Sequence, residues 1–208
     1  MTIDTILTKL LMLPGIILGL SLHEFAHAWM SNKLGDPTPK LQGRLTINPL
    51  AHIDWVGFAA LVLVGFGWGR PVQIDPRYYK NRRRDEFLVS IAGVTMNLIL
   101  AVLLSFPAKA CENLYYKTGG SAVVENIYLI LMYAVMINIV LMIFNLIPCP
   151  PLDGWGIVTQ LFKLDRYDWW YKVYQYGTWI LLGLIVLNVT DMIITPAVSA
   201  IMRLLGLF

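Results

Sequence analysis

Four long apolar stretches limit what this chain can fold into more than any other feature of its sequence. They cover residues 5–29, 87–107, 124–147 and 176–194. A helix needs about 20 mainly apolar residues to cross the roughly 30 Å hydrocarbon layer of a bilayer. Each stretch has about this length, so the sequence predicts about four transmembrane helices.

The composition excludes the soluble alternatives. Hydrophobic residues make up 57% of the 208 positions and charged residues 14%, against roughly 45–50% and about 25% in soluble domains. So few charges do not cover the surface of a soluble protein of this size, and a disordered chain would show the opposite balance. We therefore expect an all-α, multi-pass protein of the cell membrane, with residues 1–208 forming a single domain in the lipid bilayer.

The region between the first two spans is expected to differ from the rest. Residues 55–69 form a fifth apolar run, which contains four glycines and is too short to cross the membrane. Non-helical backbone is tolerated at membrane depth only where it is buried in protein or lines a cavity, so we expect a hairpin or re-entrant segment. Residues 35–54 carry three prolines, which favour turns and short strands, with a strand at 41–47. The prediction for residues 35–69 is a short membrane-associated β or hairpin region.

The basic residues predict the orientation. Six of the 16 lie between positions 70 and 84, and Lys and Arg beside a span mark its cytoplasmic side. The second span then runs outward and the third returns, so the first and third spans end together on the cytoplasmic side. A basic run can also bind lipid headgroups or nucleic acid, but a net charge of +3 is too small to suggest nucleic acid.

The clearest chemical signal is the run His23-Glu24-Phe25-Ala26-His27, near the end of the first span. Residues four apart lie on one face of a helix, where two imidazoles can bind one metal ion with Glu24 beside them as general base. The alternative is a helix end whose polar residues reach interfacial water. The position within an apolar span favours the metal, because ionisable groups at membrane depth are costly and usually functional.

Two histidines leave a zinc site incomplete, because catalytic zinc usually takes three protein ligands and one water. His52 is the only other histidine, and Asp153 is the stronger candidate. The prolines at 148, 150 and 151 cannot continue a helix, so the chain can turn back toward the first span. A lone aspartate there would more often cap a turn or helix, but beside the histidine pair Asp153 is the favoured third ligand of one zinc ion per chain.

These motifs together resemble the site-2 protease family of intramembrane zinc metalloproteases. HEFAH at 23–27 and NLIPCPPLDG at 145–154 carry the resemblance, and residues 43–54 and 67–93 extend it over most of the chain. No inserted PDZ domain is evident, as in the compact branch of the family. The sequence departs from the family pattern at Trp155, where a second glycine is common, and within residues 92–97, which read AGVTMN in place of A-G-P-x-x-N.

The resemblance implies that His23, His27 and Asp153 bind zinc and that Glu24 is the catalytic acid and base. The expected activity is hydrolysis of a peptide bond within or next to a transmembrane segment of a membrane-anchored protein substrate. Zinc lowers the pKa of bound water toward about 7, and Glu24 would accept its proton and pass it to the leaving amine. Because a helix hides its peptide bonds, the substrate must unwind, and the strand expected at 41–47 would pair with it.

Several polar residues have open roles. Asn145 either donates a hydrogen bond to the substrate or its oxyanion or links two helices. Asn97 and Asn138 are interpreted as packing residues. His52 is interpreted as a loop histidine paired with Asp54, and support of a zinc ligand is the less favoured role.

Two other functions compete with the protease. A catalytically idle homologue would bind membrane helices without cutting them, but such a protein has no need of Glu24. A metal transporter would call for a relay of ligands and for repeat symmetry, whereas the other spans contain no histidine. The sequence therefore favours the endopeptidase.

Overall fold

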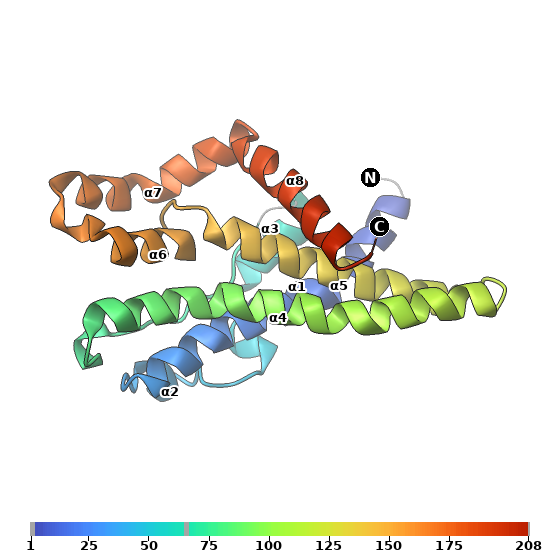
Figure 1. The fold of residues 1–208 in the computed structure, drawn as a ribbon, viewed down its shortest axis with the longest axis horizontal. Helices are drawn as coiled ribbons and strands as arrows, with labels where there is room; N and C mark the ends of the chain where they lie inside the picture. The colour runs from blue at the N-terminus through green and yellow to red at the C-terminus, as the bar shows by residue number, and fades with distance from the viewer. Residues whose placement is uncertain (1–2, 65–66, 208) are drawn as a thin grey trace.

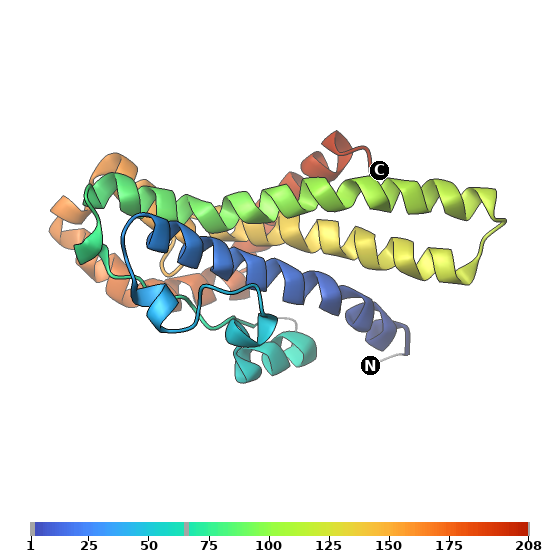
Figure 2. The ribbon, with the colours of Figure 1, turned by 90° about the horizontal axis from the view of Figure 1, so that it is seen from below.

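Three long helices form the centre of the protein in the computed structural model, which describes residues 3–64 and 67–207 (Figure 1). They are α1 (Ile3–Lys33), α4 (Arg82–Lys117) and α5 (Ala122–Leu146). Each is long and apolar enough to cross a membrane, and each packs against the other two. Figure 2 shows α4 and α5 as an antiparallel pair with α1 beside them. These helices confirm three of the predicted spans.

The fourth apolar stretch is bent. It falls on α7 (Asp168–Val186) and α8 (Val189–Leu204), two helices that meet at 70° and count as one span only if the pair is taken together. Asn188 sits at the bend with φ of 56°, a left-handed conformation that asparagine tolerates better than most residues. The described residues therefore hold three spans, or four with the bent pair, in agreement with the predicted all-α membrane fold.

Small residues bring the central helices close together. A side chain on Gly15 of α1 would meet the backbone of Ala134 in α5, and one on Gly19 would meet Leu141. Such small-residue contacts are typical of helices that pack in lipid. A buried apolar cluster fills the space between α4, α5 and α8, and its members include Val94, Ala101, Val135, Ile139 and Met202.

The expected strands are not found among the described residues. Residues 34–54 form turns around the short helices α2 (Thr38–Leu41) and η1 (Pro49–Ala51). The strand expected at 41–47 is wrong, because Gly43 has φ of 69° and the amide of Arg44 turns back to the carbonyl of Pro39. The prolines and Gly43 therefore favour turns more strongly than the alternating side chains favour a strand.

Residues 67–69 pack back on residues 55–64, as expected of a hairpin or re-entrant segment, but the first arm is the helix α3 (Trp55–Val64). The Asp54 carboxylate accepts the amide of Gly57 at 2.8 Å and caps this helix. The returning chain packs so closely that a side chain on Gly57 would overlap the carbonyl of Trp68. A helix satisfies its own backbone hydrogen bonds in an apolar setting, which explains why this apolar run is helical.

The remaining elements carry the chain into and out of the central helices. The short helix η2 (Pro76–Tyr78) precedes α4, whereas α6 (Asp153–Phe162) and η3 (Leu164–Arg166) follow α5. Between α5 and α6 lies the proline loop (residues 147–152), which contains a cis peptide bond between Pro150 and Pro151. Helix α6 packs on α4, where Gln160 donates a hydrogen bond to Glu86. A side chain on Gly156 would overlap the Ser90 side chain, so α6 lies along the first turns of α4.

Candidate metal centre

The three residues expected to bind zinc lie together. The Nε2 atoms of His23 and His27 are 3.1 Å apart, and each is 3.3 Å from Oδ2 of Asp153. Among the described residues, they form the one group of three His, Cys, Asp or Glu side chains whose ligand atoms converge in this way. Ligand atoms bonded at about 2.0–2.1 Å to a tetrahedral zinc ion lie roughly 3.3 Å from one another. The observed spacing therefore fits a zinc ion.

The local sequence explains why Asp153 reaches the histidines. Helix α5 ends at Leu146, and α6 begins at Asp153 directly after the proline loop. A side chain on Gly154 would overlap the carbonyl oxygens of Leu146 and Ile147, so α6 can start this close to α5 only with glycine there. Oδ2 of Asp153 is buried and accepts no hydrogen bond from the described part of the chain. A bound cation would satisfy this oxygen.

Hydrogen bonds turn both imidazoles toward the centre. Nδ1 of His27 lies 2.8 Å from the carbonyl oxygen of Val89, and Nδ1 of His23 lies 2.7 Å from Oδ1 of Asn97. Both partners are acceptors, so each Nδ1 carries the proton and each Nε2 presents its lone pair to the shared point. Partners of this kind fix the tautomer and orientation of metal-binding histidines.

Asn97 has a more specific place than the packing role expected from the sequence. Its side chain is fully buried, and its amide nitrogen donates to the carbonyl of Gly19 and to Oδ1 of Asn138. Asn138 in turn donates to the carbonyl of Ala134. Asn97 thus links α1, α4 and α5 while it holds His23. An asparagine in an apolar span indicated a polar partner, but the partner's identity depends on helix packing.

Gly93 was not singled out from the sequence. It lies on α4 directly behind the histidines, and an added Cβ would overlap Nε2 of His27 and the ring of His23. The absence of a side chain lets α4 pass this close to the imidazoles. Only the packed structure shows this requirement.

Glu24 faces the same pocket, a cavity of about 240 Å³ that also reaches Asn145. Its Oε2 accepts a hydrogen bond of 2.9 Å from the amide of Val72. Val72 belongs to the covering segment (residues 70–75), part of which lines the cavity opposite the histidines. The backbone of this segment therefore orients the Glu24 carboxylate, a contact that sequence patterns do not reveal.

The covering segment is fixed at its far end by a buried carboxylate. Asp36 accepts hydrogen bonds from the Ser31 hydroxyl at 2.7 Å and from the Asp75 amide at 2.8 Å, and Ser31 also contacts the Tyr79 hydroxyl. Burial acts to raise the pKa of the Asp36 carboxyl, but hydrogen bonds from Thr38, Asp75 and Ser31 outweigh it and lower that pKa. Burial raises the pKa of Tyr79 to about 12.

The sequence leaves the roles of Asn145 and His52 open, and the structure shows their hydrogen bonds. Asn145 lines the cavity, but its amide donates to the carbonyl of Leu141 in its own helix at 2.9 Å. His52 is a buried loop histidine whose Nε2 lies 2.8 Å from the carbonyl of Thr46. The expected pairing of His52 with Asp54 is wrong, because that carboxylate caps α3.

Comparisons with known proteins agree with this geometry. The sequence model of peptidase family M50 matches residues 111–187. The chain is 36% identical over 190 residues to the "putative zinc metalloprotease YwhC" of Bacillus subtilis, a match covering 89% of this chain and 84% of that protein. It is 29% and 28% identical to proteins named "putative zinc metalloprotease Rip2" from Mycolicibacterium smegmatis and Mycobacterium tuberculosis.

The matches differ in extent. The Rip2 matches cover 71% and 70% of this chain, which spans about half the length of those relatives. No solved structure matches the chain. The similarity to YwhC extends over most of both proteins. By its relatives, the chain belongs to peptidase family M50, the site-2 protease family of zinc metalloproteases, whose cofactor is zinc.

Proposed function

We propose that this protein is an intramembrane endopeptidase that hydrolyses a peptide bond within or next to a transmembrane segment of a membrane-anchored protein. His23, His27 and Asp153 hold the zinc ion, and Glu24 is the general base and acid. The observation that carries the proposal is the convergence of three ligand atoms beside Glu24, on a helix long enough to cross a membrane.

The protein supplies orientation and proton transfer. Zinc, when bound, would act as a Lewis acid that activates water and polarises the peptide carbonyl. Glu24 accepts the proton of the attacking water and delivers it to the nitrogen of the leaving amine as the C–N bond breaks. The Val72 amide holds the carboxylate in place for both transfers. Asn145 uses one of its two amide hydrogens within its own helix, so the second can bond the substrate.

The membrane setting supports a cytoplasmic site. The end of α1, the proline loop and the start of α4 lie at the same end of the molecule (Figure 1). Three of the basic residues between positions 70 and 84, Arg82 to Arg84, begin α4 at this end, and basic residues beside a span favour the cytoplasmic side. We therefore place the catalytic centre toward the cytoplasm.

The proposal is tested by combining zinc analysis with cleavage of a model transmembrane substrate. Glu24→Gln should keep one zinc per chain and lose at least about 100-fold in kcat/KM, because a general base contributes roughly 10²–10⁴-fold. Glu125→Gln, in the first turn of α5, is the matched control and should cleave as the wild type does. Full cleavage by Glu24→Gln would contradict the assigned role, and zinc-loaded wild-type protein that cleaves no substrate would favour the idle homologue.

A further inference from the structure

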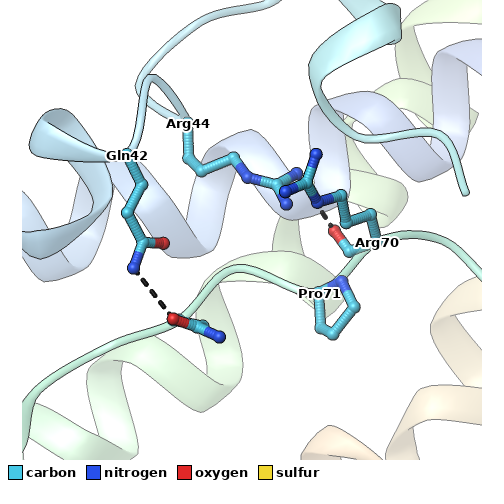
Figure 3. A pocket seen from close by; sticks show the side chains of 5 residues that line it. Gln42, Arg44, Arg70 and Pro71 are labelled. Carbon is cyan, nitrogen blue, oxygen red and sulfur yellow. Dashed lines mark hydrogen bonds between the residues drawn. The ribbon is translucent and has the colours of Figure 1, made fainter.

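A second cavity adjoins the metal-site pocket. It has a volume of about 430 Å³, and its lining residues are Gln42, Arg44, Arg70, Pro71 and Gln73 (Figure 3). Pro71 also lines the metal-site pocket, so the two cavities share a wall. Nothing in the proposed hydrolysis accounts for the two arginines.

Arg44 is unusual because its charge is buried without an ion pair in the described part of the chain. Only 6% of the residue is exposed, and its NH1 group donates to the backbone carbonyls of Ala51 and Arg70. In the described part of the chain, no carboxylate forms an ion pair with Arg44 or Arg70. Buried arginines are normally paired, because an unpaired charge is costly to remove from water.

The guanidinium groups of the buried Arg44 and the exposed Arg70 lie close together. Figure 3 shows them converging at the centre of the cavity. Burial and then the nearby charge of Arg70 lower the pKa of Arg44, and the opposite effect of the Glu24 carboxylate is smaller. On the opposite side of the cavity, Gln42 donates a hydrogen bond of 2.8 Å to Gln73. Each guanidinium has five N–H donors, so the cavity offers many donors and a double positive charge.

We propose that this cavity binds an acidic side chain of the protein substrate, close to the bond that is cut. The inference rests on the proposed function. A planar guanidinium matches the two oxygens of a carboxylate, and two adjacent guanidiniums are neutralised in part by one bound carboxylate.

The shared wall favours a substrate side chain over a lipid phosphate. Val72 and Ile74 line the metal-site pocket, whereas Gln73 between them lines the second cavity, as alternating side chains of extended backbone do. Pro71 lines both cavities, so a side chain of a peptide bound in the metal-site pocket reaches the arginine cavity past Pro71. Substrates with Asp or Glu beside the cleaved bond are the class that this arrangement selects.

The test compares pairs of model substrates that carry either Asp or Asn at successive positions near the cleavage site. At the position that reaches the cavity, the wild type should favour Asp over Asn by about tenfold in kcat/KM, and Arg70→Gln should bring this ratio close to one. Arg70 is preferred to Arg44 as the variant, because Arg44 holds the Ala51 carbonyl. Arg77→Gln is the matched control. Its side chain is 88% exposed and pairs with Asp75 in the next part of the same loop, and it should keep the wild-type ratio.

A binding measurement separates this inference from the proposed function. The Asp and Asn substrates are titrated onto the Glu24→Gln variant, with and without Arg70→Gln, in nanodiscs of neutral lipid and of lipid containing anionic phospholipid. An Asp preference that disappears with Arg70→Gln supports the cavity, even if the wild type cleaves nothing and the proposed function fails. Three results would overturn the inference. They are equal binding of the Asp and Asn substrates at every position, an Asp preference that Arg70→Gln leaves unchanged, and an effect of Arg70→Gln seen only with anionic lipid. The last result would identify a lipid-headgroup site.

Discussion

The central helices and the C-terminal arm (α7) are built in different ways. Around the metal centre, α1, α4 and α5 meet through glycines and a buried asparagine network, with Gly93 directly behind the histidines. The arm makes aromatic contacts, as at Trp170, which stacks on Trp155 of α6 and on Tyr174 with ring centroids 6.3 and 5.4 Å apart. Close backbone contact leaves no room for added atoms, whereas aromatic rings at a surface can shift. The centre should therefore be far less tolerant of substitution than the arm.

The glycines give the largest expected contrast. Gly93→Ala places a methyl group against both imidazoles, and we expect it to abolish stoichiometric zinc binding and to lower kcat/KM at least about 100-fold, since small displacements of catalytic groups have effects of this size. Gly183→Ala in α7 is the matched control, because an added Cβ there meets nothing within 4 Å. Its effect should be neutral or stabilising by up to about 1 kcal/mol. Zinc stoichiometry and cleavage rates measure both, and normal zinc binding by Gly93→Ala would break the comparison.

Asn97 should have the next largest effect. Asn97→Ala removes the acceptor for Nδ1 of His23, so zinc affinity should fall about 10- to 100-fold, as is typical when such a partner is lost. Asn97→Asp keeps an acceptor oxygen and should recover part of this loss. Asn126→Ala, at an exposed position of α5, is the control. Competition with a zinc chelator measures the affinity, and an Asn97→Ala variant with wild-type affinity would show that the network has no influence on the metal.

The anchor of the covering segment predicts a smaller effect with a defined pH dependence. Asp36→Ala removes hydrogen bonds to a buried carboxylate and should lower the free energy of unfolding by about 2 kcal/mol. Because the pKa of Asp36 is lowered on folding, its contribution is present above the ordinary pKa of about 4 and is lost as the pH falls through the folded value. The rate of limited proteolysis within residues 34–79, compared between pH 3 and 6, measures this loss of stability. If Asp36→Ala and the wild type show the same pH dependence, Asp36 does not stabilise the segment.

Gly177 tests a place where the arm closely approaches the proline loop. A side chain there would overlap Pro150. Gly177→Ala should therefore lower the free energy of unfolding by about 1–3 kcal/mol, as overpacking does. Zinc stoichiometry should stay at one per chain, because the ligands lie on α1 and at the start of α6. Loss of zinc in this variant would show that the arm also determines the metal geometry.

Much of the fold and of the candidate site could be predicted from the sequence. Apolar length predicted the spans, because crossing lipid requires a helix of that length. The spacing of His23 and His27, together with the prolines before Asp153, predicted three residues that the structure places at one point. These are local properties of the chain, so no knowledge of packing was needed.

The rest depends on tertiary contacts. The hairpin or re-entrant segment expected at residues 55–69 has a helical first arm at residues 55–64. The sequence does not predict this helix, because periodicity alone does not distinguish a helix from a strand in a short apolar run. The partners of Asn97, the amide that holds Glu24 and the arginine cavity arise where distant segments meet. The bend at Asn188 likewise depends on how α8 packs against α5.

The most direct test of the central claim is zinc X-ray absorption spectroscopy on the purified protein, prepared without chelators. The account predicts one zinc per chain with two imidazole ligands and oxygen ligands at about 2.0–2.1 Å, and an oxygen shell that is reduced in Asp153→Ala. A sulfur ligand at about 2.3 Å, a spectrum unchanged by Asp153→Ala, or protein that binds no zinc would contradict it.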